Sequence, residues 1–279
     1  MGKPTAVEPV RWIVGSAGAS RGVYITETNA LVKFGPHVFS SREAATMKYV
    51  LQNFPDIPVP VVYDFWTGDD GFGYISMAPM PGKDLDEIWP ELDSLERESV
   101  MKDYKSILQR LRALDPSPDT PIQIGAIDGG PAVDHRPSDR RSSGPFSTEA
   151  ELNNWLLSLV HPDSQTCHSD FFVETVKGGM RDDHKWRMTH GDMGPHNILV
   201  DNGRITAVLD WELAGWYPEY WEYVKMIQYL PFECDDFKSY ARRLWSVGKA
   251  DVFYDVEYMI DQTLDSQVVH GERVIKRPR

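Results

Sequence analysis

The spacing of apolar residues changes near residue 80 of this 279-residue chain. Before that point, short apolar runs rich in β-branched and aromatic residues alternate with Gly, Asn and Asp, a pattern that predicts β-strands joined by turns. The expected strands cover residues 10–14, 22–26, 30–34, 61–66 and 73–77. One helix is expected among them, over residues 42–53, with Ser40 and Ser41 as its N-terminal cap.

Beyond residue 80 the apolar positions take on helical spacing. They recur on one face over residues 94–114 and again over residues 148–160, where Thr148 is suited to cap the helix. Residues 217–265 are also expected to be helical. The segment between these helices, residues 115–147, is rich in Pro, Gly, Asp and Ser and is expected to form a long loop.

A run of Pro and Gly at residues 79–82 separates the two patterns and indicates a boundary between two parts of the chain. We therefore expect an α+β fold. Its strand-rich part covers residues 1–80, and its mainly helical part covers residues 81–279.

The segment 189–212 carries the strongest indication of function. Asn202-Gly203 lies between two apolar runs, which is a strong signal for a two-residue hairpin because both turn positions need positive φ. Such a hairpin brings Asn197, before its first strand, beside Asp210, after its second. Both side chains offer oxygen ligands that suit Mg²⁺. Asp192, on the preceding loop, can accept a hydrogen bond from an attacking hydroxyl, so the set predicts an ATP-dependent phosphotransferase.

These residues resemble the aminoglycoside phosphotransferase family, whose protein-kinase-like fold also includes choline kinases. The resemblance covers most of the chain and is closest to fungal proteins with this domain. It implies a small antiparallel-sheet N-terminal lobe with one helix and a larger, mainly helical C-terminal lobe. It also implies that Asp192 is the catalytic residue and that Asn197 and Asp210 hold Mg²⁺.

The family resemblance also assigns residues upstream of the hairpin to an ATP site. Lys33, on a predicted strand, is expected to bind the α- and β-phosphates, and Glu43, on the next helix, to hold that lysine. The connector would bind adenine through backbone groups of Ala78 and Met80, with Met77 at the back of the pocket. In the loop at residues 15–22, which departs from the kinase glycine pattern, small residues and the hydroxyl of Ser20 are expected to approach phosphate.

Net charge, apolar runs and cysteine spacing limit the classes of partner and the compartment that we expect. The net charge of −13 argues against nucleic acid and anionic membranes as general partners. No apolar run approaches the length of a membrane span, and an apolar signal core is not found at the N-terminus, so we expect a cytoplasmic protein. The two cysteines, Cys167 and Cys234, have no metal-ligand spacing and indicate neither a disulfide framework nor a zinc site.

These residues and the family resemblance thus predict phosphorylation of a hydroxyl on a small molecule, with ATP and Mg²⁺. A protein kinase is disfavoured because only a short segment separates Asp210 from the next helix. Two alternatives stay open: a nucleotide-binding pseudokinase without activity, and a kinase-like scaffold recruited to another reaction in secondary metabolism. The sequence names neither the acceptor nor the oligomeric state, and residues 115–185 are expected to influence acceptor choice.

Overall fold

The computed structural model describes residues 9–114, 122–136, 139–159, 169–228, 235–247, 250–251 and 257–262. The chain forms two compact units. Unit 1 consists of residues 1–111 and 192–214, and unit 2 consists of residues 112–191 and 215–279. The lobe boundary expected between residues 80 and 81 stays a prediction. Both cysteines lie outside the described residues, and no described helix is long and apolar enough to cross a membrane.

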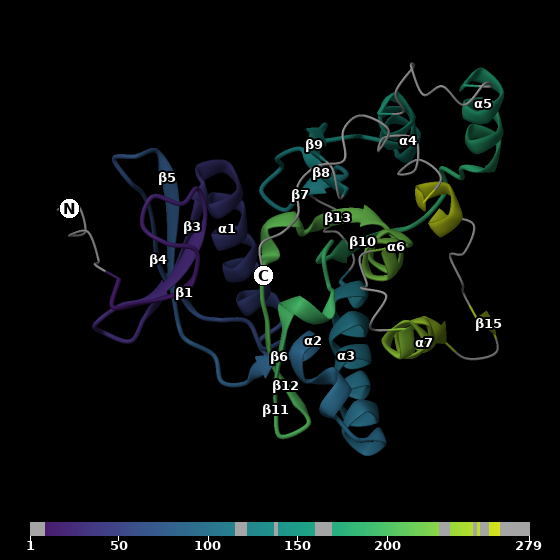
Figure 1. Cartoon of the computed structure of the whole chain (residues 1–279). Helices are drawn as coiled ribbons and strands as arrows, with labels where there is room; N and C mark the ends of the chain where they lie inside the picture. The colour runs from purple at the N-terminus through teal and green to yellow at the C-terminus, as the bar shows by residue number, and fades with distance from the viewer. Residues whose placement is uncertain are drawn as a thin grey trace. The chain divides into compact units, whose positions relative to one another are not determined.

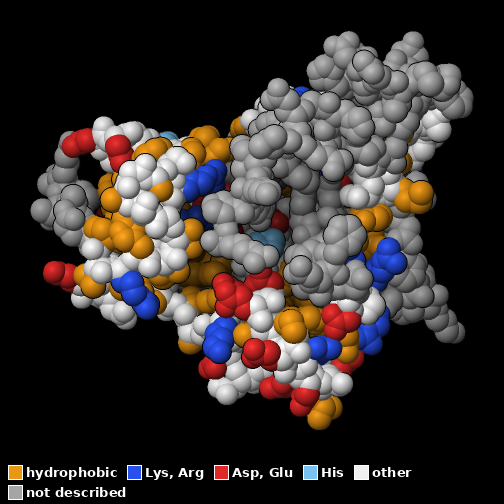
Figure 2. Space-filling view, viewed as in Figure 1, with side chains coloured by type: hydrophobic (Ala, Val, Ile, Leu, Met, Phe, Trp, Pro, Cys, Tyr) orange, Lys and Arg blue, Asp and Glu red, His pale blue; other side chains and the backbone are white. Residues whose placement is uncertain are grey.

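An antiparallel sheet of five strands forms the first part of unit 1, in the order β1-β2-β3-β5-β4. Its strands are β1 (Arg11–Val14), β2 (Gly22–Ile25), β3 (Leu31–Pro36), β4 (Val62–Thr67) and β5 (Phe72–Met77). All five predicted strands are confirmed within two residues. Tyr24, Val32 and Phe34 are buried together against neighbouring aromatic rings. Figure 2 shows further hydrophobic side chains on the surface of this sheet.

Helix α1 (His37–Asn53) packs against β3, β4 and β5, as Figure 1 shows. It begins directly after β3, with Pro36 at its N-cap position, five residues earlier than the sequence analysis expects. The predicted cap at Ser40 and Ser41 is therefore wrong. Ser40 is buried inside the helix, and the Ser41 hydroxyl donates to the Val38 carbonyl instead. Pro36 needs no partner for an N–H, and its fixed φ lets the strand turn straight into a helix.

The second part of unit 1 consists of short elements around one long helix. After β6 (Lys83–Asp84) come α2 (Leu85–Ile88), the 3-10 turn η1 (Trp89–Glu91) and α3 (Ser94–Ala113). The predicted hairpin is present as β11 (Ile198–Asp201) and β12 (Arg204–Val208), and β11 also pairs with β6. Asn202 and Gly203 have φ of 49° and 69°, as the Asn-Gly turn requires. The guanidinium of Arg204 donates to both carboxylate oxygens of Asp103, which ties the hairpin to α3.

Unit 2 has a sheet in the order β10-β13-β7, formed by β10 (Trp186–Thr189), β13 (Gly215–Pro218) and β7 (Gly125–Ala126). A separate pair joins β8 (Ala132–Arg136) to β9 (Asp139–Ser143). The expected long loop therefore contains three strands. The glycines and polar residues of this segment hide the strands, yet glycine is needed at the start of β7, because a Cβ on Gly125 would lie 2.5 Å from the Gly130 carbonyl oxygen.

The part of unit 2 that the structure describes contains helices α4 (Glu149–Ser158), α5 (Ser169–Gly179), α6 (Trp221–Gln228) and α7 (Asp235–Leu244), and residues 257–262 are also helical. Thr148 caps α4 by accepting from the Glu151 N–H, as predicted. The continuous helical region expected over residues 217–265 is wrong, because it begins in β13 and later contains β14 (Ser246–Val247) and β15 (Ala250–Asp251). Helix α5 was not predicted. The side chains of Trp216, Trp221 and Trp245 are buried.

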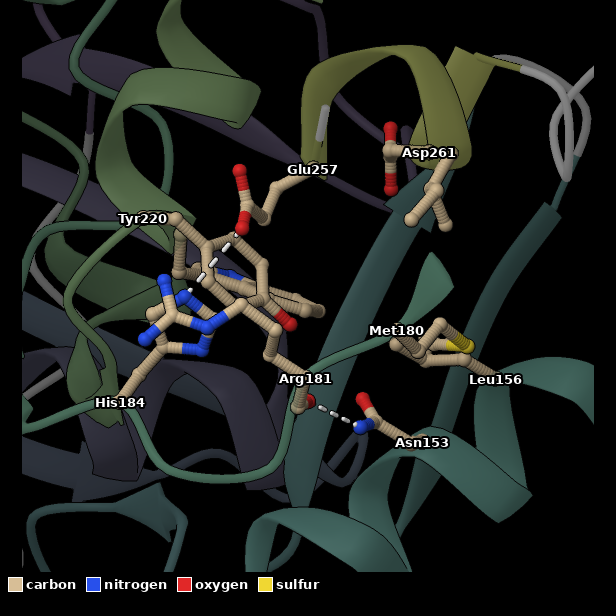
Figure 3. A pocket seen from close by; sticks show the side chains of 10 residues that line it. Asn153, Leu156, Met180, Arg181, His184, Tyr220, Glu257 and Asp261 are labelled. Atoms are coloured by element: carbon tan, nitrogen blue, oxygen red, sulfur yellow. Dashed lines mark hydrogen bonds and ion pairs between the residues drawn. The ribbon is translucent and has the colours of Figure 1, made fainter. Parts of the chain in front are cut away.

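A buried histidine connects three segments of unit 2. The His184 ring pairs with Glu149 of α4 through Nδ1, at 2.7 Å, and with Glu257 through Nε2, at 3.3 Å. Figure 3 shows His184 and Glu257 beside Tyr220. All three residues belong to the wall of a small cavity of about 20 Å³. Burial acts to lower the pKa of His184, but the hydrogen bonds and charges of the two glutamates outweigh it and raise the pKa to about 9. The folded protein therefore holds an imidazolium between two carboxylates.

This arrangement predicts a pH dependence of folding stability. The pKa of His184 is raised from 6.5, so its contribution is complete below pH 6.5 and is lost as the pH rises through about 9. The loss is on the order of 3 kcal/mol. Urea unfolding between pH 6.5 and 9.5 should show it as a fall in the free energy of unfolding, and His184→Gln should flatten the fall. A fall of equal size in the variant would contradict this assignment.

Candidate functional site

Unit 1 contains a cavity of about 800 Å³, which lies in the size range of small-molecule sites. Its wall includes parts of β1 to β3, helix α1, the connector after β5, and the two ends of the β11–β12 hairpin. Among the residues predicted for the site, the wall contains Lys33, Glu43, Met77, Ala78, Met80, Asn197 and Asp210. The fold thus brings together residues that are up to 177 positions apart in sequence.

The amine of Lys33, on β3, belongs to the wall of this cavity. Its Nζ lies 2.8 Å from a carboxylate oxygen of Glu43, on α1, and 2.8 Å from Oδ1 of Asp210. Burial acts to lower the pKa of Lys33, but the negative charges around it outweigh burial and raise the pKa. Burial raises the pKa of Glu43, and the charge of Lys33 opposes that rise. The lysine is therefore held as a cation between two carboxylates.

Asp210 lies at a sharp bend after β12. Its φ and ψ are both 62°, a left-handed conformation that is uncommon for residues other than glycine. It precedes the 3-10 turn η3 (Trp211–Leu213), in which Trp211 is fully buried and donates from its indole N–H to the Val208 carbonyl at 3.0 Å. The buried ring fixes the bend, and the bend points the Asp210 carboxylate at Lys33.

Asn197 and Asp192 interact just before the first strand of the hairpin. The Asn197 side-chain amide donates to the Asp192 carbonyl at 2.8 Å and to Asp192 Oδ2 at 3.1 Å. The backbone carbonyl of Asn197 accepts from Leu209, the residue before Asp210, at 2.8 Å. The hairpin therefore places Asn197 beside the strand end that carries Asp210, as the sequence predicts. Asp192 is not part of the cavity wall.

Two residues that the sequence analysis did not select hold the loop around Asp192. His196 Nε2 lies 3.4 Å from Asp192 Oδ2. Burial acts to lower the pKa of His196, but its contact with the Asp192 carboxylate outweighs burial and raises it. The hydroxyl of Tyr104, on α3, donates to the carbonyl of Met193. Neither residue has a local sequence signal for this role, because the contacts depend on how α3 and the loop pack.

The two residues before Asp192 are fixed within unit 2 by Glu222, on α6. Its carboxylate accepts from the His190 N–H at 2.5 Å and from the Gly191 N–H at 3.3 Å. Glu222 is 2% exposed and His190 is fully buried. The sequence analysis missed Glu222, since nothing local links it to a motif more than 30 residues away.

The connector after β5 borders the cavity at Met77, Ala78 and Met80. Met77 is buried. The Ala78 N–H donates to the Val61 carbonyl at 2.9 Å, which fixes the end of β5 against the residue that precedes β4. Gly82 has a φ of 117°, and a Cβ there would lie 2.8 Å from the Val200 carbonyl oxygen. Glycine thus lets the connector pass close to the hairpin.

The small-residue loop before β2 departs from the expectation in one respect. Ser20 is exposed and is not part of the cavity wall, so its predicted phosphate contact stays a prediction. The next residue, Arg21, does line the cavity. Its Nη1 donates to both carboxylate oxygens of Glu212 at 3.1 Å. Oxygen atoms of Glu212, Glu43 and Asp210 lie within 4.8 Å of one another.

The combination of an antiparallel sheet, a Lys–Glu pair between strand and helix, and an Asn–Asp hairpin defines a kinase-like α+β protein. The chain belongs to the APH phosphotransferase enzyme family, whose model matches residues 13–245. The predicted family and fold class are therefore confirmed.

Known proteins agree with this assignment. Hygromycin-B 4-O-kinase from Escherichia coli is 24% identical over 181 residues, which cover 60% of this chain and 47% of that protein, so the match spans about half of the relative. The apo structure of a thermostable mutant of aminoglycoside phosphotransferase APH(4)-Ia has a TM-score of 0.64 at 17% identity, covering 93% of this chain and 86% of that one. ADP-bound APH(2'')-Ib has a TM-score of 0.63 at 14% identity, covering 98% and 89%.

Glu222 should stabilise the fold through the two N–H groups it accepts from. Glu222→Ala removes the acceptor, and a buried N–H left without one costs about 1–3 kcal/mol. Urea unfolding should show a clear loss of stability. Glu174→Ala is the matched control, because the Glu174 side chain is 72% exposed, and it should change stability by less than about 0.5 kcal/mol. Equal effects of the two substitutions would contradict the role of Glu222.

Proposed function

We propose that this protein is an ATP- and Mg²⁺-dependent phosphotransferase that transfers the γ-phosphate of ATP to a hydroxyl group of a small molecule. The observation that carries the proposal is the Lys33 amine held between Glu43 and Asp210 in the wall of an 800 Å³ cavity. A fixed cation beside a carboxylate suited to Mg²⁺ is what phosphoryl transfer requires, since catalysis there depends mainly on positioning and charge neutralisation.

ATP as the phosphate donor is supported by the cavity and by the relatives. Structures of APH(4)-Ia mutants include a ternary complex with AMP-PNP and hygromycin B, and APH(2'')-Ib binds ADP. In this chain Lys33 would bind the phosphates. The backbone groups of Ala78 and Met80 would bind adenine, with the buried Met77 side chain behind the ring. Ser20 is assigned to the loop that approaches the phosphates.

Asp192 is proposed as the catalytic residue. Its carboxylate would accept a hydrogen bond from the acceptor hydroxyl and orient that oxygen toward the γ-phosphorus. The contacts from Asn197 and His196 hold the carboxylate in place. Asp192 lies outside the cavity wall, which suits a group that acts on the acceptor rather than on the nucleotide.

Asn197 and Asp210 fit Mg²⁺. The side-chain nitrogen of Asn197 donates to two oxygens of Asp192. The side-chain oxygen Oδ1 is therefore the Asn197 atom that would bind Mg²⁺. Asp210 adds a carboxylate that is one-third exposed. When bound, Mg²⁺ would neutralise phosphate charge, and these two residues would hold it through oxygen atoms.

The acceptor is proposed only as a hydroxyl-bearing small molecule. Hygromycin B appears in the complexes of the APH(4)-Ia relatives, and streptomycin in that of APH(2'')-IIa, so amino sugars are the first compounds to test. The rival function, a nucleotide-binding protein without activity, is less well supported, since such proteins usually lose a site residue. Lys33, Asp192, Asn197 and Asp210 are all present.

A coupled assay for ADP release tests the proposal, using ATP, Mg²⁺ and a panel of amino sugars, sugars and choline-like amines. The wild-type protein should release ADP with at least one acceptor. Asp192→Asn keeps the shape of the side chain but weakens its acceptor capacity, so kcat should fall by two or more orders of magnitude while ATP affinity changes little.

Two results would contradict these roles. Loss of ATP affinity in Asp192→Asn would mean that Asp192 serves the nucleotide rather than the acceptor. Binding of ATP by the wild-type protein without turnover on any acceptor would favour the inactive binder.

A further inference from the structure

Arg21 is a cation in the cavity wall to which the sequence assigns no role. It precedes β2 and lies in the same wall as Lys33 and Asp210. Its partner Glu212 lies two residues beyond Asp210, and oxygen atoms of Glu212 lie within 4.8 Å of those of Glu43 and Asp210. The ion pair therefore places the guanidinium at the end of the cavity where Lys33 lies.

The path of the side chain is built into the fold. A Cβ on Gly35 would lie 3.3 Å from the Arg21 Cγ, so glycine leaves room for the stem to cross β3. The guanidinium carbon then lies 5.5 Å from the centre of the Phe39 ring, on α1. Beyond that ring it reaches Glu212, in η3. The side chain thus runs along the cavity wall and is supported at several points.

The charges around Lys33 favour a further cation. Three carboxylates, those of Glu43, Asp210 and Glu212, stand close together, and Lys33 is already paired with two of them. A guanidinium there would add to the positive charge that Lys33 and the proposed Mg²⁺ offer a polyphosphate. A guanidinium offers five N–H donors, and the contact with Glu212 uses one nitrogen.

Arg21 is more exposed than Glu212, as a residue that contacts a ligand must be. The Glu212 side chain is 6% exposed, whereas the Arg21 side chain is 42% exposed. The buried carboxylate acts as an anchor, and the guanidinium stays within reach of a ligand. Arginine suits phosphate because its planar fork can donate two parallel hydrogen bonds to phosphate oxygens.

We propose that Arg21 binds the phosphates of the nucleotide, and that Glu212 is the positioning residue that holds Arg21 in the cavity wall. This assignment rests on the proposed function. It moves the phosphate contact of the loop from the exposed hydroxyl of Ser20 to the neighbouring side chain.

Calorimetric titration with ATP, ADP, AMP and adenosine tests the assignment, with Mg²⁺ present throughout. Arg21→Gln should raise the Kd of ATP about tenfold or more, because a charge-assisted hydrogen bond is lost. The effect should shrink as phosphates are removed, and adenosine should bind within twofold of wild type. Arg110→Gln is the matched control. It removes the same charge from an exposed pair with Asp56, outside the cavity wall, and should leave all four affinities unchanged.

A double variant separates binding from folding. Arg21→Gln alone removes the guanidinium from the buried Glu212 carboxylate, and the melting temperature should fall. Arg21→Gln combined with Glu212→Gln removes both charges, so the melting temperature should recover while the weak binding of ATP persists. Recovery of ATP affinity in the double variant would show that the ion pair is structural only and would overturn the proposal.

Two other results would also overturn it: ATP affinity within twofold of wild type in Arg21→Gln, or an equal loss for adenosine and ATP. Failure of the proposed function gives different results. A wild-type protein that binds ATP without turnover on any acceptor lacks the transfer activity, yet its Arg21 contact is still measured by the same titrations. A wild-type protein that binds none of the four compounds has no nucleotide site. The assignment of Arg21 would fall with it.

Discussion

The contact between the Lys33 amine and the carboxylates of Glu43 and Asp210 is the interaction on which the rest of the site depends. Each member comes from a different element: a strand, a helix and the bend after the hairpin. Burying a charged amine costs free energy unless its partners are close, and removing one partner of a buried pair leaves an uncompensated charge. The sheet, helix α1 and the hairpin must therefore keep their places for the contact to exist.

The surrounding structure serves to hold those three elements. Pro36 turns β3 directly into α1, so Lys33 and Glu43 lie on consecutive elements that pack together. The buried indole of Trp211 fixes the left-handed bend at Asp210. Beside this bend, at the start of the first hairpin strand, the Asn197 amide holds the Asp192 carboxylate. Regular elements and their ends thus position Lys33, Glu43 and Asp210, which is the arrangement that catalysis by positioning needs.

Much of the site could be predicted from sequence, because its signals are local. Asn202-Gly203 specifies the hairpin through its φ angles, and the hairpin alone brings Asn197 beside the strand end of Asp210. The strands of the first sheet follow from their apolar runs. Lys33 and Glu43 could be selected by order along the chain, although each residue type is common on surfaces.

The functional residues that could not be predicted from the sequence depend on packing between distant segments. Arg21 and Glu212 are 191 positions apart, and Glu222 reaches the backbone of His190 from a later helix. Neither contact has a periodicity that a sequence could reveal. The strands β7 to β9 were missed for another reason: the glycines and polar residues of their segment resemble a loop, whereas glycine at position 125 is required by the close approach of the Gly130 carbonyl oxygen. Tertiary contact overrides local propensity at such positions.

We propose that Lys33, Asn197 and Asp210 form a nucleotide site that needs Mg²⁺. The most direct measurement is the Kd of ATP by calorimetry, with Mg²⁺ and with EDTA, for the wild-type protein and for Asp210→Asn. Binding by the wild-type protein should be at least tenfold tighter with Mg²⁺, and the variant should lose that difference. Equal binding with and without Mg²⁺, or a difference that persists in Asp210→Asn, would contradict the claim.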